Sequence, residues 1–207
     1  WKKNNLGKNW VLGETLITGI GQGYTQTTPL QLCLMTAQIA NGGYKIKPKI
    51  IVNNDPINVD LAKKSMEKQN LLNPDYKLVK ENKNLRIVQE AMFSSTNEIR
   101  GTSYRSRIDD PKYQFAGKTG TAQVKRISKR ERELDLKIDQ IPYNDRDHAL
   151  YVAYGPYKNP RYALSIIVEH GGSGSKAAAP MAKKLFKLII DRDELREKQP
   201  NFEEISI

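Results

Sequence analysis

The 207-residue sequence predicts an α+β fold in which helices flank an antiparallel β-sheet. Two apolar runs, 149–154 and 162–169, are separated by Gly155-Pro-Tyr-Lys-Asn-Pro160, an arrangement typical of a β-hairpin. A third strand is predicted to begin near Phe115, where polar and small side chains alternate. Apolar residues at helical spacing precede and follow these strands. The length and the 38% of hydrophobic residues suit one domain with a core of its own.

The first predicted helix begins after Thr28. Thr28 can serve as the N-cap, Pro29 as the first helical residue and Gln31 as the capping-box partner. The glycine pair 42–43 would end the helix. Cys33, the single cysteine, cannot form an internal disulfide, and a thiol at this position is expected in the core. The apolar residues beside it recur at helical spacing: Leu30, Leu34 and Ala37.

A long polar segment separates this helix from the next. Residues 53–84 are rich in Asn, Lys and Pro, and we expect them to form a surface excursion with room for one short helix over 61–68. The second helix, over 85–93, would place three apolar side chains on one face: Leu85, Val88 and Met92.

A last helix is predicted over 176–190, with Pro180 in its first turn. It would cover the sheet with three apolar residues spaced four apart: Met181, Leu185 and Ile189. Together with the hairpin and the strand near Phe115, this gives three antiparallel strands flanked by helices.

The strand near Phe115 carries the residues with the clearest chemistry. Lys118 supplies a point charge, and the hydroxyls of Thr119 and Thr121 are hydrogen-bond donors. Gly120 has no Cβ to keep a ligand's backbone at a distance. The two-residue period of a strand would direct Thr119, Thr121 and Gln123 to the ligand and the intervening residues away from it. The sequence therefore predicts an anion-binding strand edge.

Other small-ligand sites fit the sequence poorly. A phosphate-binding loop needs a glycine upstream of Lys118, and residues 111–116 contain none. The glycines of segment 19–23 lack the spacing of a dinucleotide loop. His148 and His170 follow acidic residues, but no further ligands stand at metal-binding spacing, so we expect both histidines to be structural. We predict no metal and no cofactor.

The net charge of +11 raises the alternative of a nucleic-acid-binding protein. The positive charge is densest over 125–137, which also contains acidic residues, and no stacking or zinc-binding motif accompanies it. A solvated loop of mixed charge explains this stretch better. If it has a partner, an anionic membrane surface or the pyrophosphate of a lipid-linked precursor would suit its charge. No apolar run approaches the roughly 18 residues that a membrane helix requires.

The order of several motifs resembles class B penicillin-binding proteins, in particular the elongation-specific penicillin-binding protein 2 group. Lys-Thr-Gly is one of three motifs shared by penicillin-recognising serine acyltransferases. The resemblance covers about residues 1–190, and 191–207 are expected to be a variable tail. The quoted segments are Glu14–Gln31 with its Gly-Gln-Gly, Gly101-Thr102, Lys118-Thr-Gly-Thr121, His148–Pro156, Tyr162–Glu169 and Gly171-Gly172.

The resemblance implies a β-lactamase/transpeptidase-like fold, of which this chain would be the C-terminal portion with about three of five strands. In that family the nucleophilic Ser-x-x-Lys and the Ser-x-Asn precede the Gly-Gln-Gly segment, so both are expected upstream of Trp1. Three matches within the chain stand in the wrong order: Ser65–Lys68, Ser173–Lys176 and Ser95–Asn97. We expect none of them to be catalytic and the fragment alone to be inactive.

The family's activity is peptidoglycan D,D-transpeptidation by serine acyl transfer, and its enzymes are the targets of β-lactams. The resemblance implies that Lys118 supplies positive potential at the substrate's terminal carboxylate. The Thr119 and Thr121 hydroxyls would bind that carboxylate, and the Thr121 backbone N–H would belong to the oxyanion hole. Gly120 and the edge through Gln123 would accept the substrate as an added strand.

The resemblance also implies a cellular setting. Peptidoglycan stem peptides and β-lactams would be the ligands, and the cell-wall elongation machinery would supply protein partners. The protein would work at the periplasmic face of the inner membrane, with its anchor outside this fragment. Two alternatives remain open: a non-catalytic penicillin-binding sensor module, and the basic nucleic-acid-binding protein.

Overall fold

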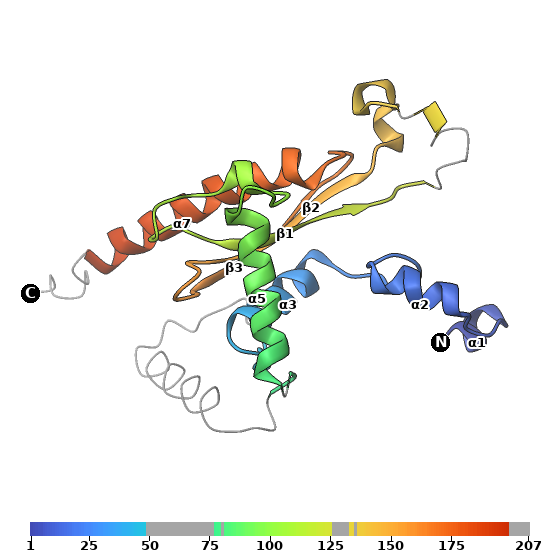
Figure 1. Ribbon diagram of the computed structural model, residues 1–207, viewed down its shortest axis with the longest axis horizontal. Helices are drawn as coiled ribbons and strands as arrows, with labels where there is room; N and C mark the ends of the chain where they lie inside the picture. The colour runs from blue at the N-terminus through green and yellow to red at the C-terminus, as the bar shows by residue number, and fades with distance from the viewer. Residues whose placement is uncertain (49–76, 80, 126–132, 135, 199–207) are drawn as a thin grey trace, which may run out of the picture.

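A computed structural model describes residues 1–48, 77–79, 81–125, 133–134 and 136–198. Three antiparallel strands form its sheet in the order β1-β2-β3. The strands are β1 (Ala116–Ala122), β2 (His148–Gly155) and β3 (Tyr162–Val168). The predicted hairpin between the two apolar runs and the predicted strand near Phe115 are confirmed. Figure 1 shows α7 (Ala179–Lys198) along one face of this sheet and α3 (Pro29–Ala40) on the other side, with α5 (Asn82–Asn97) crossing the sheet.

Two short helices at the N-terminus extend away from the sheet (Figure 1). They are α1 (Lys2–Leu6) and α2 (Leu12–Gly19). Lys2 Nζ lies 2.5 Å from Glu14 Oε1, and hydrogen bonds from Lys2 and from the Val11 backbone lower the pKa of the Glu14 carboxyl. This ion pair joins the start of α1 to the first turn of α2.

Helix α3 (Pro29–Ala40) begins as predicted. Thr28 Oγ1 accepts a hydrogen bond from Gln31 N, and Gln31 Oε1 accepts one from Thr28 N, which completes the capping box. Cys33 Sγ donates to the Ala163 carbonyl at 3.4 Å, and burial raises the pKa of the thiol. The thiol thus packs against β3 but is only partly buried, whereas a position in the core was expected. The predicted apolar face is only partly correct, because Leu30 is 59% exposed.

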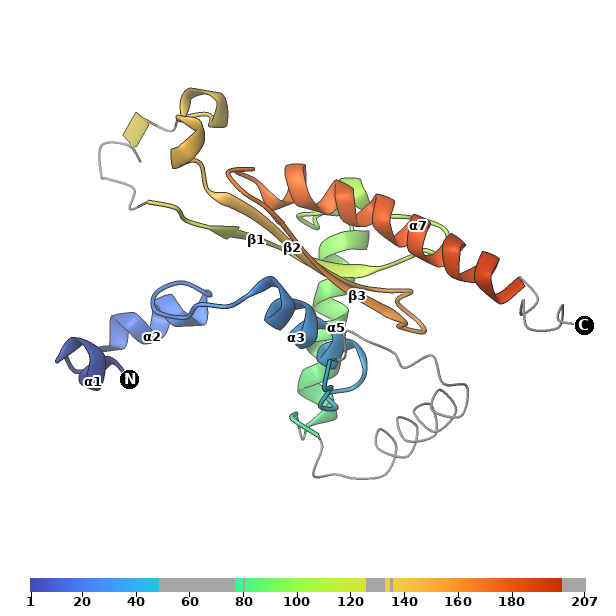
Figure 2. The ribbon, with the colours of Figure 1, turned by 180° about the vertical axis from the view of Figure 1, so that it is seen from behind.

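Helix α5 (Asn82–Asn97) confirms the second predicted helix and extends it at both ends. Residues 82–84 are therefore helical and do not belong to the predicted surface excursion. The short helix predicted over 61–68 lies outside the described residues. Leu85, Met92 and Thr96 are the buried residues of α5, and the helix crosses the edge of the sheet beside β1 (Figure 2).

Helix α7 (Ala179–Lys198) follows a π-helical turn, η5 (Gly174–Ala178). The predicted sheet-facing residues were wrong: Met181 and Leu185 are 47% and 39% exposed. The buried stripe lies one residue further along the helix: Ala182, Phe186 and Ile190. Small alanines let the helix approach the sheet, and the Phe186 ring stacks on Phe115 with the centroids 4.8 Å apart.

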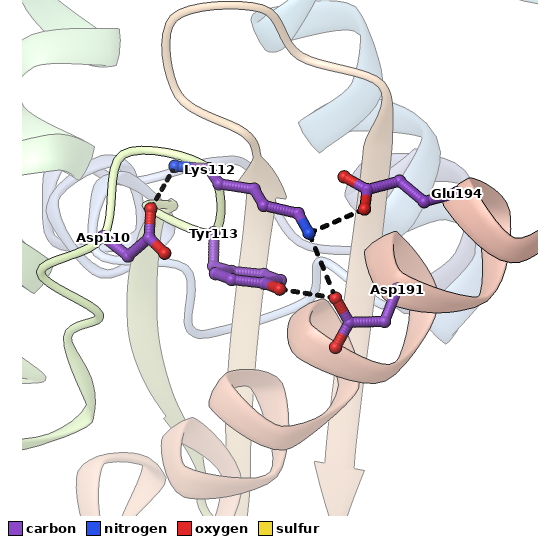
Figure 3. Close-up of polar contacts among 5 residues, drawn as sticks. All are labelled: Asp110, Lys112, Tyr113, Asp191 and Glu194. Carbon is purple, nitrogen blue, oxygen red and sulfur yellow. Dashed lines mark hydrogen bonds and ion pairs between the residues drawn. The ribbon is translucent and has the colours of Figure 1, made fainter.

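The last turns of α7 are held by a polar cluster (Figure 3). Lys112 Nζ lies 2.8 Å from Glu194 Oε2 and 3.3 Å from Asp191 Oδ1, and Tyr113 Oη donates to Asp191 at 2.5 Å. The helix therefore ends later than the predicted Ile190, and residues 191–198 of the expected tail are helical. The remaining residues, 199–207, lie outside the described part of the chain.

Candidate functional site

The outer edge of β1 is partly covered by side chains from the C-terminal turn of α5. Asn97 Nδ2 donates to the Phe115 carbonyl at 2.9 Å, and Thr96 Oγ1 lies at 3.5 Å from the Gly117 carbonyl. These two carbonyls face α5 and thus point away from β2. Because backbone groups alternate sides along a strand, the odd-numbered residues of β1 present their N–H and C=O groups at the outer edge.

The odd-numbered residues beyond the α5 contacts are Thr119 and Thr121, followed by Gln123. The alternation places the Thr121 N–H at the outer edge, where the oxyanion role was predicted for it. Lys118 Nζ donates to the Thr119 carbonyl at 2.9 Å, so the ammonium also lies at this edge. A charge and outward-facing backbone groups therefore meet over residues 118–123.

The side chains of β1 divide between the two faces of the sheet. Lys118 pairs with Val152 and Gly120 with Leu150, whereas Thr119 pairs with Tyr151. Val152 and Leu150 line a groove that runs along β1. The register agrees with the predicted alternation, in which Thr119 and Thr121 point to one face and Gly120 and Ala122 to the other. Residues of both sets line the groove, and the ligand-facing role of the threonine row stays a prediction.

The groove has a volume of about 1130 Å³. One wall is β1, and the other is the end of α2, the Gly-Gln-Gly segment 21–23 and the start of α3. Gly21 and Gly23 have φ values of 80° and 86°, which favour glycine. The lining residues are Ile17, Ile20, 21–23, 25–28, Gln31, Leu32 and Met35 on one side, 118–125 on the other, and His148, Leu150, Val152 and Ile167 at the base.

A row of hydroxyl groups leads from α5 to β1. Ser95 Oγ lies 3.2 Å from Thr102 Oγ1, which lies 3.1 Å from Thr119 Oγ1. Thr102 belongs to the Gly101-Thr102 pair quoted above, but no pattern in the sequence connects it with Thr119. Only the folding of the turn after α5 onto the edge of β1 brings the two together.

Two of the three serine motifs that stand in the wrong order lie in the described part of the chain, and both make local contacts. Ser95 bonds with Thr102, and the Asn97 amide donates to the Phe93 and Phe115 carbonyls. Ser173 Oγ lies 3.0 Å from Ser175 Oγ. Ser65 lies outside the described residues. The described geometry gives neither Ser95 nor Ser173 the paired lysine that a serine nucleophile of this type needs.

The two histidines contact each other at the end of the sheet. His148 Nδ1 accepts a hydrogen bond from the His170 backbone N–H at 2.9 Å, and the rings are 4.8 Å apart. His170 Nδ1 bonds with the Arg146 carbonyl. Within the described ranges, no three His, Cys, Asp or Glu side chains gather as metal ligands would.

Sequence comparison assigns most of the chain to one family. The sequence model for the penicillin binding protein transpeptidase domain matches residues 2–187. The chain belongs to this family. It is 32% identical, over 192 residues, to the peptidoglycan D,D-transpeptidase MrdA of Salmonella typhimurium, and 35% identical over 189 residues to MrdA of Acinetobacter baumannii.

The fold is that of solved PBP2 structures. PBP2 of Pseudomonas aeruginosa in complex with WCK 5153 shows 34% identity and a TM-score of 0.67, with 91% of this chain and 36% of that one covered. PBP2 of Helicobacter pylori in complex with MreC shows 33% identity and a TM-score of 0.64, with 91% and 30% covered. The predicted transpeptidase-like fold is thereby confirmed.

The matched region is a part of these relatives. It comprises 92% of this chain but 29% of the Salmonella protein, and 90% of this chain but 26% of the Acinetobacter protein. In the part of the chain that the structure describes, no helix combines the length and the apolar character needed to cross a membrane.

Proposed function

We propose that the whole protein is a peptidoglycan D,D-transpeptidase of the elongation-specific type and that this chain supplies the Lys-Thr-Gly wall of its active site. The observation that carries the proposal is the outer edge of β1, where the Lys118 ammonium meets outward-facing backbone groups of 119–123. Membership of the transpeptidase family and the activity named for the MrdA relatives support it.

In the proposed reaction, a serine hydroxyl outside these 207 residues attacks the carbonyl between the two terminal D-alanines of a stem peptide. The serine proton passes to a base, an ester bond to the serine forms, and the last D-alanine leaves as the amine after taking up a proton. The amine of a second stem peptide then attacks the ester, forms the cross-link and frees the serine.

Each residue of the edge has a part in this scheme. Lys118 attracts the terminal carboxylate of the substrate, and the Thr119 and Thr121 hydroxyls donate hydrogen bonds to it. The Thr121 N–H stabilises the oxyanion of the tetrahedral intermediate, a contribution of about 2.7–4 kcal/mol for one such donor. Gly120 lets the substrate backbone approach, and the edge through Gln123 pairs with it as an added strand.

The same site would take β-lactams, which mimic the terminal dipeptide and stop at the acyl stage. The MreC complex of the Helicobacter relative supports a partner in the elongation machinery. We place the protein at the periplasmic face of the inner membrane, where stem peptides are found, with its anchor outside this sequence.

The two alternatives lack a specific observation in their favour. A sensor module would share the Lys-Thr-Gly strand, but the relatives named above are transpeptidases. Family membership leaves the nucleic-acid hypothesis without support, and most of the basic stretch 125–137 lies outside the described residues.

Intact-mass measurement after incubation with benzylpenicillin tests the proposal. The full-length protein should gain one penicilloyl group at a serine outside residues 1–207, and the 207-residue chain alone should gain none. A stoichiometric adduct on Ser65, Ser95 or Ser173 would contradict the assignment. A full-length, folded protein that is not labelled would contradict the function itself.

A further inference from the structure

We propose that Thr102 is a positioning residue for Thr119: its hydroxyl orients that of Thr119 for hydrogen bonding to the substrate's terminal carboxylate. The inference rests on the proposed function, because it concerns the same carboxylate. Its basis is the contact of 3.1 Å between Thr102 Oγ1 and Thr119 Oγ1, and that of 3.2 Å between Ser95 Oγ and Thr102 Oγ1.

The chemistry of a carboxylate sets the direction of this row of hydroxyls. A threonine or serine hydroxyl has one proton to donate and two lone pairs to accept with, whereas an ionised carboxylate only accepts. Thr119 must therefore give its proton to the carboxylate and accept from Thr102, which in turn accepts from Ser95. Aligned in this way, each hydrogen bond strengthens the next.

Thr102 is held in place by its two neighbours in the chain. A Cβ on Gly101 would lie 2.4 Å from the Ser95 carbonyl oxygen, so this turn approaches α5 more closely than another residue would allow. Ser103 donates to the same carbonyl from both its backbone N–H and its hydroxyl, each at 3.0 Å. The backbone of Thr102 is therefore fixed on both sides.

A fixed Thr102 restricts the rotamer of Thr119. The Thr119 hydroxyl can rotate among staggered positions, and the Thr102 contact favours the one seen here. A neutral hydrogen bond contributes about 0.5–1.5 kcal/mol, which corresponds to a change of about 2- to 13-fold in rate if the orientation is needed in the transition state.

The test measures the second-order rate constant of acylation in the full-length protein, with a penicillin that carries its free carboxylate and with the methyl ester of the same penicillin. Thr102→Val should slow acylation by the acid about 2- to 13-fold and change the rate with the ester little. Thr102→Ser, which keeps the hydroxyl, should restore the rate with the acid. Ser94→Ala is the matched control, since its hydroxyl bonds instead to Glu98, the C-cap residue of the same helix.

A double-mutant cycle separates positioning from a general structural effect. In a Thr119→Val background, Thr102→Val should have no further effect, because the hydroxyl that it orients is gone. An undiminished effect in that background would overturn the proposal, as would equal slowing with acid and ester, or a parental rate for Thr102→Val.

If Thr102→Val does not fold, Ser95→Ala takes its place. Ser95→Ala should slow acylation by the acid, by a smaller factor, and leave acylation by the ester unchanged. A parental acylation rate for this variant would then overturn the proposal. Failure of the proposed function would look different. In that case the parental protein itself would not be acylated, whereas a failure of positioning alone leaves the parent reactive and the Thr102 variants unchanged.

Discussion

The Tyr151 hydroxyl lies 2.9 Å from Thr96 Oγ1, and this contact ties the central strand of the sheet to α5. Ser103 Oγ lies 3.1 Å from the same hydroxyl, and both partners are buried. The phenol passes over Gly117, where a Cβ would lie 2.4 Å from the phenolic oxygen. Gly117, the residue before Lys118, is thus packed against Tyr151 on one face of the sheet. The groove residues Leu150 and Val152 lie on the opposite face.

Tyr151→Phe should lower the free energy of unfolding by about 0.5–1.5 kcal/mol, because Thr96 and Ser103 lose one hydrogen bond each but keep others. Urea denaturation of the full-length protein measures this. An unchanged midpoint would mean that the buried hydroxyl adds nothing to the stability of the sheet.

The same residue predicts a pH dependence. Burial raises the pKa of Tyr151 in the folded state above the value near 10 of an unfolded chain. Above about pH 10 the unfolded chain releases this proton while the folded chain keeps it, so stability is complete below that pH and falls as the pH rises. Tyr151→Phe should make this decline shallower in denaturation series above pH 10. Part of the slope should remain, since burial also raises the pKa of Tyr154.

The sheet-facing stripe of α7 can be tested by two substitutions on the same helix. Phe186→Ala removes a fully buried ring that stacks on Phe115 and should cost about 3–5 kcal/mol. Met181 was predicted to face the sheet but is 47% exposed. Met181→Ala should therefore change the free energy of unfolding by less than about 0.5 kcal/mol. Thermal unfolding compares the two, and equal losses would contradict the observed orientation of the helix.

The polar cluster at the end of α7 predicts a local effect of acid (Figure 3). A hydrogen bond from Tyr113, and then contacts with Lys112, lower the pKa of Asp191. A carboxyl with a lowered folded pKa stabilises the fold above its unfolded value of about 3.9, and this stabilisation is lost as the pH falls below that value.

Hydrogen exchange, corrected for intrinsic rates, should therefore show the peptide 190–198 less protected at pH 3 than at pH 7. Asp191→Asn should show the low protection already at pH 7. Asp193→Asn, on the same helix, is the matched control. Equal protection in Asp191→Asn and the parent at pH 7 would show that the cluster does not hold the helix end.

Patterns of neighbouring residues correctly predicted those structural elements whose formation depends on residues close together in the chain. The capping box at Thr28 and the hairpin after Gly155 form as expected, because each depends on residues close together in the chain. The sheet-facing side of α7 could not be predicted in this way. Leu185 and Phe186 are both apolar, and only the space beside Phe115 and Gly155 decides which of them is buried.

The site shows the same division. Lys118 and its neighbours could be proposed as site residues from their own chemistry. Other features of the site depend on contacts between residues 7 to 21 positions apart. These features are the row of hydroxyls from Ser95 through Thr102 to Thr119, and the contacts of α5 with the Phe115 and Gly117 carbonyls. No periodicity or motif contains that information.

The last prediction concerns Lys118 in the full-length protein. Lys118→Ala should slow β-lactam acylation by about 10²- to 10³-fold, because it removes the charge that we propose attracts the carboxylate. Folding should stay near normal, since Lys118 is exposed and its hydrogen bond is to the neighbouring Thr119 carbonyl. Stopped-flow acylation and thermal unfolding of the same preparations measure the two effects.

Two further variants separate charge from shape at this edge. Lys118→Arg keeps the charge but replaces a compact ammonium with a planar fork, so it should restore the acylation rate only in part. Thr121→Val should have a milder effect than Lys118→Ala, because it removes a hydroxyl and keeps the backbone N–H that we assign to the oxyanion hole. If Lys118→Ala is acylated at the parental rate, the carboxylate is bound elsewhere, and the role proposed for this strand edge is wrong.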